Sequence, residues 1–187
     1  RQMIESIEAN FDSAEELIHD LLDIARLDSR TLVVKPAPVS IGRLFQRLAS
    51  DMQALSVDRG IGLTFVPSSL TVLSDPIYLR RIAQNLVSNA LKYTSTGRVL
   101  VGTRRRHRMA WLEVHDTGPG IAEADCERIF HEFERVPGLE QPGTGLGLSI
   151  VERACRQLGH QIELHSRVGV GSCFRVGLPV VEGLCLI

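Results

Sequence analysis

The sequence predicts an α+β fold: a two-layer α/β sandwich of helices over a mixed, largely antiparallel sheet, preceded by one long bundle helix. Three observations predict it. Residues 1–30 carry an apolar stripe at helical spacing. Pro36 and Pro38 then end any helix, because proline removes a backbone donor and forces the preceding residue into extended conformation. Beyond them, helical and strand-like segments follow one another without the regular strand–helix–strand order of a parallel sheet.

The segment 1–30 is predicted to be one helix of a multi-helix bundle. Its apolar or small residues alternate between spacings of three and four, which places them on one side of a helix. They are Ile4, Ile7, Phe11, Ala14, Ile18, Leu21 and Ala25. Leu17, Leu22 and Ile24 widen this stripe, which favours a four-helix bundle over a two-stranded seam. We therefore expect partner helices from a second copy in a homodimer, and we expect the acidic opposite faces to be solvated.

Caps, turns and periodicity predict the elements of the globular part. Ser40 is an N-cap for a helix over 41–58, and Asp75-Pro76 begins a helix over 76–93. The other expected segments are strands near 61–66 and 70–73, a hairpin of 98–103 and 109–116, a short helix near 123–130, a helix over about 145–158, and strands near 161–166 and 172–178. We divide the chain into a bundle helix (1–30), a linker (31–38), a globular domain (39–180) and a tail (181–187).

Composition excludes several classes of protein. The 187 residues are 44% hydrophobic and 23% charged, as in a folded domain. A net charge of −1 gives no reason to expect nucleic acid as a partner, and we interpret the basic turn 104–108 as a solvated hairpin tip rather than a nucleic-acid contact. The four cysteines form no CxxC pair, which excludes a zinc ligand set and favours a cytoplasmic location. Without an apolar stretch of about 20 residues, this segment is expected not to span a membrane, although the longer protein that we expect around it could be anchored in one.

Three polar side chains share one face of the predicted helix over 76–93. Asn85, Asn89 and Lys92 are spaced by four and three residues, which aligns them along the helix. Amide oxygens suit Mg²⁺ and an ammonium suits phosphate, so the set fits a metal–polyphosphate group. Exposure to solvent would by itself explain why one asparagine, either Asn85 or Asn89, occurs in this helix.

Two glycine-rich turns supply the other candidate contacts. Asp116 ends a predicted strand before Thr-Gly-Pro-Gly, where its carboxylate can accept a hydrogen bond from a purine amine. Gly143, Gly145 and Gly147 precede a helix, where backbone N–H groups can approach an anion. Their spacing matches neither the Rossmann nor the Walker pattern. Asp116-Thr-Gly also matches the aspartic-protease triplet, but that chemistry needs two carboxylates and the chain has one such triplet.

Taken together, these segments resemble the ATP-binding domain of sensor histidine kinases, a branch of the family that includes DNA gyrase, heat-shock chaperones and mismatch-repair ATPases. Five motifs follow the family's order: an N box (85–93), a first glycine box (116–121), an F box (129–135), a second glycine box (143–148) and a closing strand motif (169–174). The segment 1–30 looks like the second helix of the family's dimerisation and phosphotransfer hairpin. The resemblance therefore covers nearly the whole chain.

The resemblance implies ATP and Mg²⁺ as ligands. Asn85 would coordinate the metal, Lys92 would contact phosphate and Asp116 would accept the adenine amine. Arg135, on a lid over about 134–145, would reach the terminal phosphate and would complete a catalytic set with Asn85 and Lys92. The other implied ATP contacts are Asn89, Tyr93, Gly118, Gly120, Ile121, Phe130, Phe133, Gly143, Thr144, Gly145, Leu146, Gly147 and Leu148. Phe130 and Phe133 would also pack the root of the lid.

The implied function is transfer of the γ-phosphoryl group to a histidine on the dimerisation domain, for relay to the receiver domain of a response regulator. His19 lies on the wrong helix for that role, and we interpret it as a surface histidine rather than a phosphoacceptor or a metal ligand. Arg81 stands where gyrase-like ATPases carry a water-activating glutamate, so we expect little ATP hydrolysis. The alternatives are a degenerate nucleotide-binding module and a self-sufficient ATPase.

Overall fold

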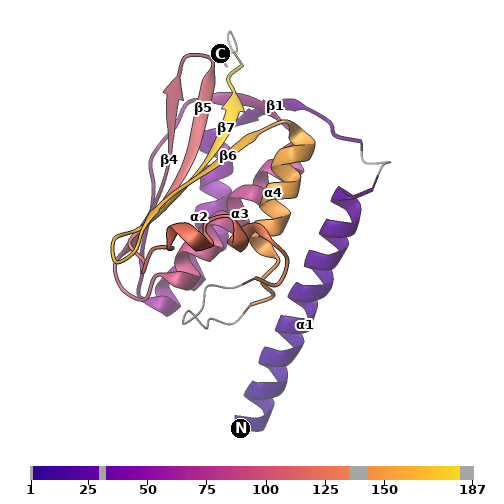
Figure 1. The fold of residues 1–187 in the computed structure, drawn as a ribbon, viewed down its shortest axis with the longest axis vertical. Helices are drawn as coiled ribbons and strands as arrows, with labels where there is room; N and C mark the ends of the chain where they lie inside the picture. Colours follow the sequence, from indigo (N-terminus) through magenta and orange to yellow (C-terminus); the bar gives the residue numbers. More distant parts are fainter. Residues whose placement is uncertain (1, 30–32, 135–142, 182–187) are drawn as a thin grey trace.

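The computed structural model describes residues 2–29, 33–134 and 143–181, with the backbone alone for 2–10, 12, 13 and 16. A sheet packs against helices, and the long helix α1 (Gln2–Leu27) runs beside this sandwich and extends past it toward the N-terminus (Figure 1). The α+β sandwich with a preceding long helix, predicted from the sequence, is confirmed. No helix in the described ranges is both long enough and apolar enough to cross a membrane.

The elements after α1 follow one another without an internal repeat. They are β1 (Ala37–Ser40), α2 (Ile41–Arg59), β2 (Gly62–Phe65), β3 (Thr71–Ser74), α3 (Pro76–Tyr93), β4 (Arg98–Arg106), β5 (Met109–Asp116), the 3₁₀ helices η1 (Glu123–Asp125) and η2 (Arg128–Phe130), α4 (Gly147–Leu158), β6 (Gln161–Arg167) and β7 (Gly171–Pro179).

The main sheet has five strands in the order β2-β4-β5-β7-β6. Only β2 and β4 pair in parallel within it, and the other neighbours are antiparallel, as expected for a largely antiparallel sheet. The register of the β5–β7 pair places Val114 opposite Phe174 and His115 opposite Cys173. This pairing brings the end of β5 and the start of β7 together at one end of the sheet.

Three elements differ from the sequence-based prediction. Residues 37–40 form β1, which pairs antiparallel with β3, although 37 and 38 were assigned to the linker. The extended backbone that the prolines impose is compatible with a short two-stranded pairing. The predicted helix near 123–130 is divided into η1 and η2, and α4 begins at Gly147 instead of 145. Gly145 has a φ of 73°, a left-handed conformation that cannot continue a right-handed helix.

Helix α3 is fixed at the centre of the molecule by its cap and by its apolar face. The Asp75 carboxylate accepts hydrogen bonds from the N–H groups of Ile77 (2.9 Å) and Tyr78 (3.4 Å), as its position before Pro76 predicts. Fully buried side chains of α3 then pack between α2, α4 and the sheet; they include Leu79, Ile82, Leu86 and Leu91. Burial of each such side chain contributes about 1.5–3 kcal/mol, which holds the polar stripe of α3 in a defined place.

Helix α1 places one side against the sandwich and leaves another exposed. Ile24 and Leu27 are buried in the common core. The Gln157 side chain on α4 donates a hydrogen bond to the Leu27 carbonyl oxygen (2.8 Å). Most of the predicted bundle stripe is outside this contact, since Phe11, Ile18, Leu21 and Leu22 are exposed, but Ile24 of the stripe is buried and Leu17 packs against the core. The expectation that all acidic faces of this helix are solvated is wrong, because Asp20 is only 3% exposed.

Candidate nucleotide-binding site

Two adjoining pockets form one continuous hollow beside α3. They share Asn89, Tyr93, Ile129, Glu134 and Leu148. Beyond these shared residues, one end is lined mainly by apolar side chains and the other mainly by polar ones. The hollow is therefore long and chemically asymmetric, as a site for a molecule with an apolar ring and a charged tail should be.

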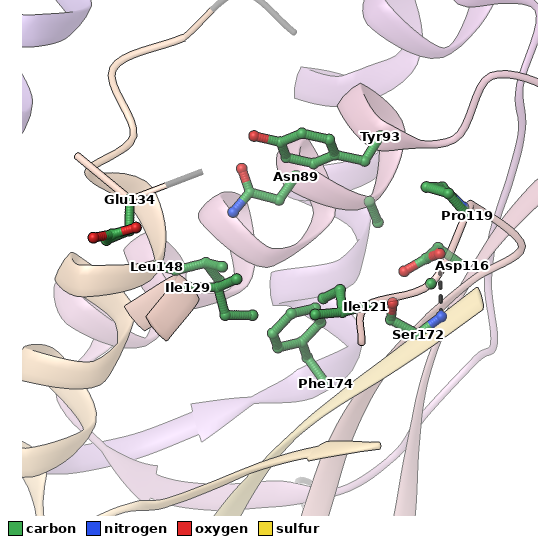
Figure 2. A pocket seen from close by; sticks show the side chains of 12 residues that line it. Asn89, Tyr93, Asp116, Pro119, Ile121, Ile129, Glu134, Leu148, Ser172 and Phe174 are labelled. Atoms are coloured by element: carbon green, nitrogen blue, oxygen red, sulfur yellow. Dashed lines mark hydrogen bonds between the residues drawn. The ribbon is translucent and has the colours of Figure 1, made fainter. Parts of the chain in front are cut away.

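The apolar end is built around the last residue of β5. Figure 2 shows Asp116 beside Ser172 at one side of the pocket, with Ile121 and Phe174 next to them. The Asp116 Oδ1 atom accepts hydrogen bonds from the N–H groups of Gly118 (2.8 Å) and Ser172 (3.2 Å). Both of these bonds use Oδ1, so Oδ2 is the atom left to accept from a ligand.

Burial raises the pKa of the Asp116 carboxyl above that of an ordinary aspartate. The two backbone hydrogen bonds, the neighbouring His115 and a hydrogen bond from the Ser172 side chain act in the opposite direction and offset part of this rise in pKa. A half-buried, oriented carboxylate beside apolar side chains is a suitable acceptor for one amine of a flat ring.

The turn after Asp116 brings the backbone close to the end of β6. Gly120 has a φ of 71°, and a Cβ atom added there would collide with the carbonyl group of Arg167. Gly118 donates to Asp116, and both Gly120 and Ile121 line the apolar end. The glycines predicted at this turn are thus required by the backbone path as well as by access to the pocket.

The polar end is formed by one stripe of α3 and by the segment before α4. Asn85, Ser88, Asn89 and Lys92 line it from α3. Gly143, Thr144, Gly145 and Gly147 line it from the other side. A Cβ atom added at Gly143 would lie 2.6 Å from the Lys92 Nζ atom, so this glycine allows the chain to pass close to the ammonium. The N box and the second glycine box, separated in the sequence, therefore face each other.

Asn85 has the property expected of a ligand-binding amide. Its Nδ2 atom is buried and has no hydrogen-bond partner within the described part of the chain. Rotation of the amide group by 180° about its last side-chain bond would place the amide oxygen at this buried position, where it can bind a cation. Asn85 therefore fits Mg²⁺ as an oxygen donor. The described ranges contain no group of three or more His, Cys, Asp and Glu side chains placed to hold a metal.

The predicted lid contacts are only partly brought to the hollow. Leu148 lines both ends, but Leu146 is fully buried in the core. Phe130 does not line the hollow; its ring makes a T-shaped contact with Phe174, with ring centroids 6.3 Å apart. Phe133 is 60% exposed; its backbone N–H donates to the Gly145 carbonyl oxygen (3.1 Å).

Arg135, predicted to reach the terminal phosphate, lies outside the described residues, as does the lid from 135 to 142. Sequence reasoning also missed several residues that line the hollow, and Ser172 and Phe174 are two of them. Ser172 and Phe174 had been assigned to the closing strand motif without a role in the site, although pairing of the last strand with the strand that ends at Asp116 would have indicated one.

Sequence reasoning also missed Asp20 of α1, which lines the polar end of the hollow. Its Oδ1 atom lies 2.6 Å from Arg81 Nη2, and its Oδ2 atom accepts a hydrogen bond from the Thr144 hydroxyl (2.7 Å). The Arg81 Nε atom lies 2.7 Å from Oδ2 of Asp23. His19, one residue before Asp20, is exposed and faces Glu15 at 3.9 Å, in agreement with a surface histidine.

The chain is similar to known proteins over most of its length. The family model described as "Histidine kinase-, DNA gyrase B-, and HSP90-like ATPase" matches residues 74–182. Virulence sensor protein BvgS of Bordetella bronchiseptica (strain ATCC BAA-588 / NCTC 13252 / RB50) is 34% identical over 93% of this chain. Sensor histidine kinase RcsC of Escherichia coli (strain K12) is 32% identical over 88% of it. These alignments cover only 15% of BvgS and 18% of RcsC.

Solved structures share the fold. The crystal structure of full-length ShkA in complex with AMPPNP matches 98% of this chain and 39% of that one, with a TM-score of 0.83 and 30% identity. The mycobacterial sensor histidine kinase MprB matches 79% of this chain and 98% of that one, with a TM-score of 0.65 and 25% identity. The similarity to ShkA therefore includes α1 as well as the sandwich.

Proposed function

We propose, since the chain belongs to the histidine kinase-, DNA gyrase B-, and HSP90-like ATPase family, that it binds Mg-ATP and is the catalytic part of a sensor histidine kinase. The observation that supports this most directly is the convergence of three distant segments on one hollow. Asp116 lies at its apolar end, the stripe of Asn85, Asn89 and Lys92 lies at its polar end, and the glycines from 143 to 147 face that stripe.

In this proposal the adenine ring occupies the apolar end. Asp116 Oδ2 accepts a hydrogen bond from the exocyclic amine, and Oδ1 stays bonded to the N–H groups of Gly118 and Ser172. Ile121, Leu148 and the other apolar side chains cover the faces of the ring and exclude water from it.

The triphosphate extends along the polar end. Lys92 contacts phosphate oxygens, the backbone from Gly143 to Gly147 follows them, and Asn85 and Asn89 hold the magnesium side of the group. Bound Mg²⁺ would supply neutralisation of the phosphate charge. The side chains position the γ-phosphoryl group for in-line attack by an imidazole nitrogen, which forms a P–N bond as the bond to the ADP leaving oxygen breaks.

The partners follow from the same proposal. The exposed stripe of Phe11, Ile18, Leu21 and Leu22 would pair with bundle helices that include those of a second copy. A histidine on the preceding bundle helix would receive the phosphoryl group and pass it to the receiver domain of a response regulator. We also propose that the chain consists of a bundle helix (1–30), a linker (31–38), a nucleotide-binding domain (39–180) and a tail (181–187). A cytoplasmic location of this segment is part of the same proposal.

The experiment for nucleotide binding is a titration with a fluorescent ATP analogue, with and without Mg²⁺. We expect Mg²⁺ to strengthen binding to the unmodified chain and to have little effect on Asn85→Ala. Gln84→Ala is the matched control, because Gln84 is the preceding residue on α3 but does not line the hollow. Absence of binding to the unmodified chain, or an equal Mg²⁺ effect in Asn85→Ala, would refute the proposal.

Phosphotransfer is tested with the protein extended upstream through the preceding helix. We expect acid-labile phosphate from ATP to be incorporated there. A longer protein that binds Mg-ATP but incorporates no phosphate would instead identify the chain as a degenerate nucleotide-binding module.

A further inference from the structure

One carboxylate at the polar end of the hollow comes from outside the sandwich. Asp20 of α1 lines the polar end together with Asn85, Lys92 and Thr144, and it does not line the apolar end. The two ends share residues in between, so Asp116 and Asp20 mark opposite ends of one path. A nucleotide with its base at Asp116 approaches Asp20 more closely as its phosphate chain becomes longer.

The Asp20 side chain is held firmly in this position. It is 3% exposed, and its two oxygen atoms contact different elements: Arg81 on α3 and Thr144 before α4. Hydrogen bonds between charged groups are among the strongest in proteins. The docked helix therefore places a fixed carboxylate, and not a mobile surface group, at the polar end.

The same contact engages the cation of Arg81, which does not itself line the hollow. Arg81 precedes Asn85 by one helical turn, on the stripe of α3 that continues to Asn89 and Lys92. In the docked arrangement its guanidinium group contacts Asp20 and Asp23 of α1. Docking thus places the Asp20 carboxylate at the polar end and pairs the Arg81 cation with carboxylates of α1.

The remaining carboxylate on the hollow does not create the same asymmetry. Glu134 lines both ends, and its Oε2 atom pairs with Arg128 Nη2 at 2.9 Å. It faces short and long nucleotides alike. Asp20 is the carboxylate, among the residues that the structure describes along this hollow, whose effect depends on phosphate chain length.

We propose that Asp20 is a specificity-determining residue: with α1 docked, it lowers the affinity of the site for ATP more than for ADP, and for ADP more than for AMP. This inference rests on the proposed function, because it assumes that the base lies at Asp116. Coupling between two binding events is reciprocal, so a bound triphosphate weakens the docking of α1 by the same factor. Asp20 would in this way link the position of the bundle helix to the nucleotide state of the site.

The test is calorimetric titration of residues 1–187 with ATP, ADP and AMP at constant Mg²⁺, for the unmodified chain and for Asp20→Asn. We expect Asp20→Asn to bind ATP about fivefold to tenfold more tightly, at the lower limit of the usual range for coupling between sites. The gain should be smaller for ADP and absent for AMP. Asp51→Asn is the matched control: it removes the same charge from the partner of Arg80 (2.9 Å), the neighbour of Arg81, away from the hollow.

Equal changes for all three nucleotides, no change, or weaker ATP binding in Asp20→Asn would overturn the inference. These results differ from failure of the proposed function, in which the unmodified chain binds none of the three nucleotides. If Asp20→Asn is unfolded at the assay temperature, Asp23→Asn replaces it, because Asp23 contacts Arg81 but does not line the polar end. Tighter ATP binding by Asp23→Asn supports the inference, and unchanged ATP binding overturns it.

Discussion

Replacing Asp116 with asparagine should change which purine the site accepts. In the structure, Oδ1 of Asp116 receives the N–H groups of Gly118 and Ser172 at 2.8 and 3.2 Å. An asparagine must keep its oxygen in that position, because its NH₂ group cannot accept these two bonds. The NH₂ group of Asp116→Asn would then replace Oδ2 and face the exocyclic amine of adenine, donor against donor.

The magnitude follows from the bond that is lost. A hydrogen bond to a charged acceptor contributes about 1.5–3 kcal/mol, and leaving a buried donor unpaired costs about 1–3 kcal/mol. Because the two effects overlap, we expect a loss of about 2–4 kcal/mol, which is a decrease in ATP affinity of about 30-fold to 1000-fold. Inosine triphosphate carries a carbonyl oxygen where ATP carries the amine, so Asp116→Asn should bind it more tightly than the unmodified chain does.

The assay is competition of ATP and inosine triphosphate against a fluorescent nucleotide. Asp125→Asn is the control, since Asp125 pairs with Arg128 on the surface and does not line the hollow. The reasoning is refuted if Asp116→Asn binds ATP as the unmodified chain does, or if its preference between the two nucleotides is unchanged.

Four further predictions follow from the structure. Burial raises the pKa of Asp116, and ATP binding needs the ionised carboxylate. On acidification, ATP affinity should therefore begin to fall at a higher pH than it would with an ordinary aspartate. ATP titrations at a series of pH values should show no such fall in Asp116→Asn. Because its pKa is raised in the folded state, the Asp116 carboxyl stabilises the ligand-free protein at low pH, and this contribution to the free energy of unfolding is lost as the pH rises through the pKa. Urea unfolding curves of Asp116→Asn should lack this contribution. Gly120→Ala should lower the free energy of unfolding by more than the roughly 1–2 kcal/mol that a left-handed residue costs, because the added Cβ meets the Arg167 carbonyl. Gly159→Ala is the control, since Gly159 also has a positive φ (67°) but no atom lies within 4 Å of the added Cβ. In urea denaturation it should cost only roughly 1–2 kcal/mol. Burial raises the pKa of the Cys155 thiol to about 12, so folded protein should resist alkylation of Cys155 at pH 8, and mass spectrometry that finds rapid native-state labelling there would contradict this.

The elements that carry the site could be predicted because their signals are local. Asp75-Pro76 marks the start of α3, and the spacing from Asn85 to Lys92 places their side chains on one face whatever the helix packs against. The hairpin that leads to Asp116 follows in the same way from alternation around a turn. Local chemistry was therefore sufficient for α3 and for the strand end.

The contacts that were missed join residues far apart in the chain. Asp20 and Thr144 are separated by 124 positions, and Asp20 and Arg81 by 61. On its own helix Asp20 is one of several acidic residues on what looks like a solvated face, and no spacing rule distinguishes it from the others. Only the docking of α1, through Ile24 and Leu27, buries this particular carboxylate.

Irregular segments were also beyond local rules. The proline-containing segment before α2 gave an extended backbone, but nothing in it specified the partner strand β3. Phe133 and Gly145 have positive φ values, and the Phe133 N–H donates a hydrogen bond to the Gly145 carbonyl oxygen. Because this contact joins two segments that are apart in the sequence, periodicity and caps could not indicate where α4 begins.

A crystal structure of residues 1–187 with Mg²⁺ and a non-hydrolysable ATP analogue tests the central proposal most directly. The adenine amine should lie within hydrogen-bond distance of Asp116 Oδ2, with the metal on the Asn85 side chain and the phosphates between Lys92 and the glycines from 143 to 147. A nucleotide bound elsewhere, or one whose base lies away from Asp116, would contradict it.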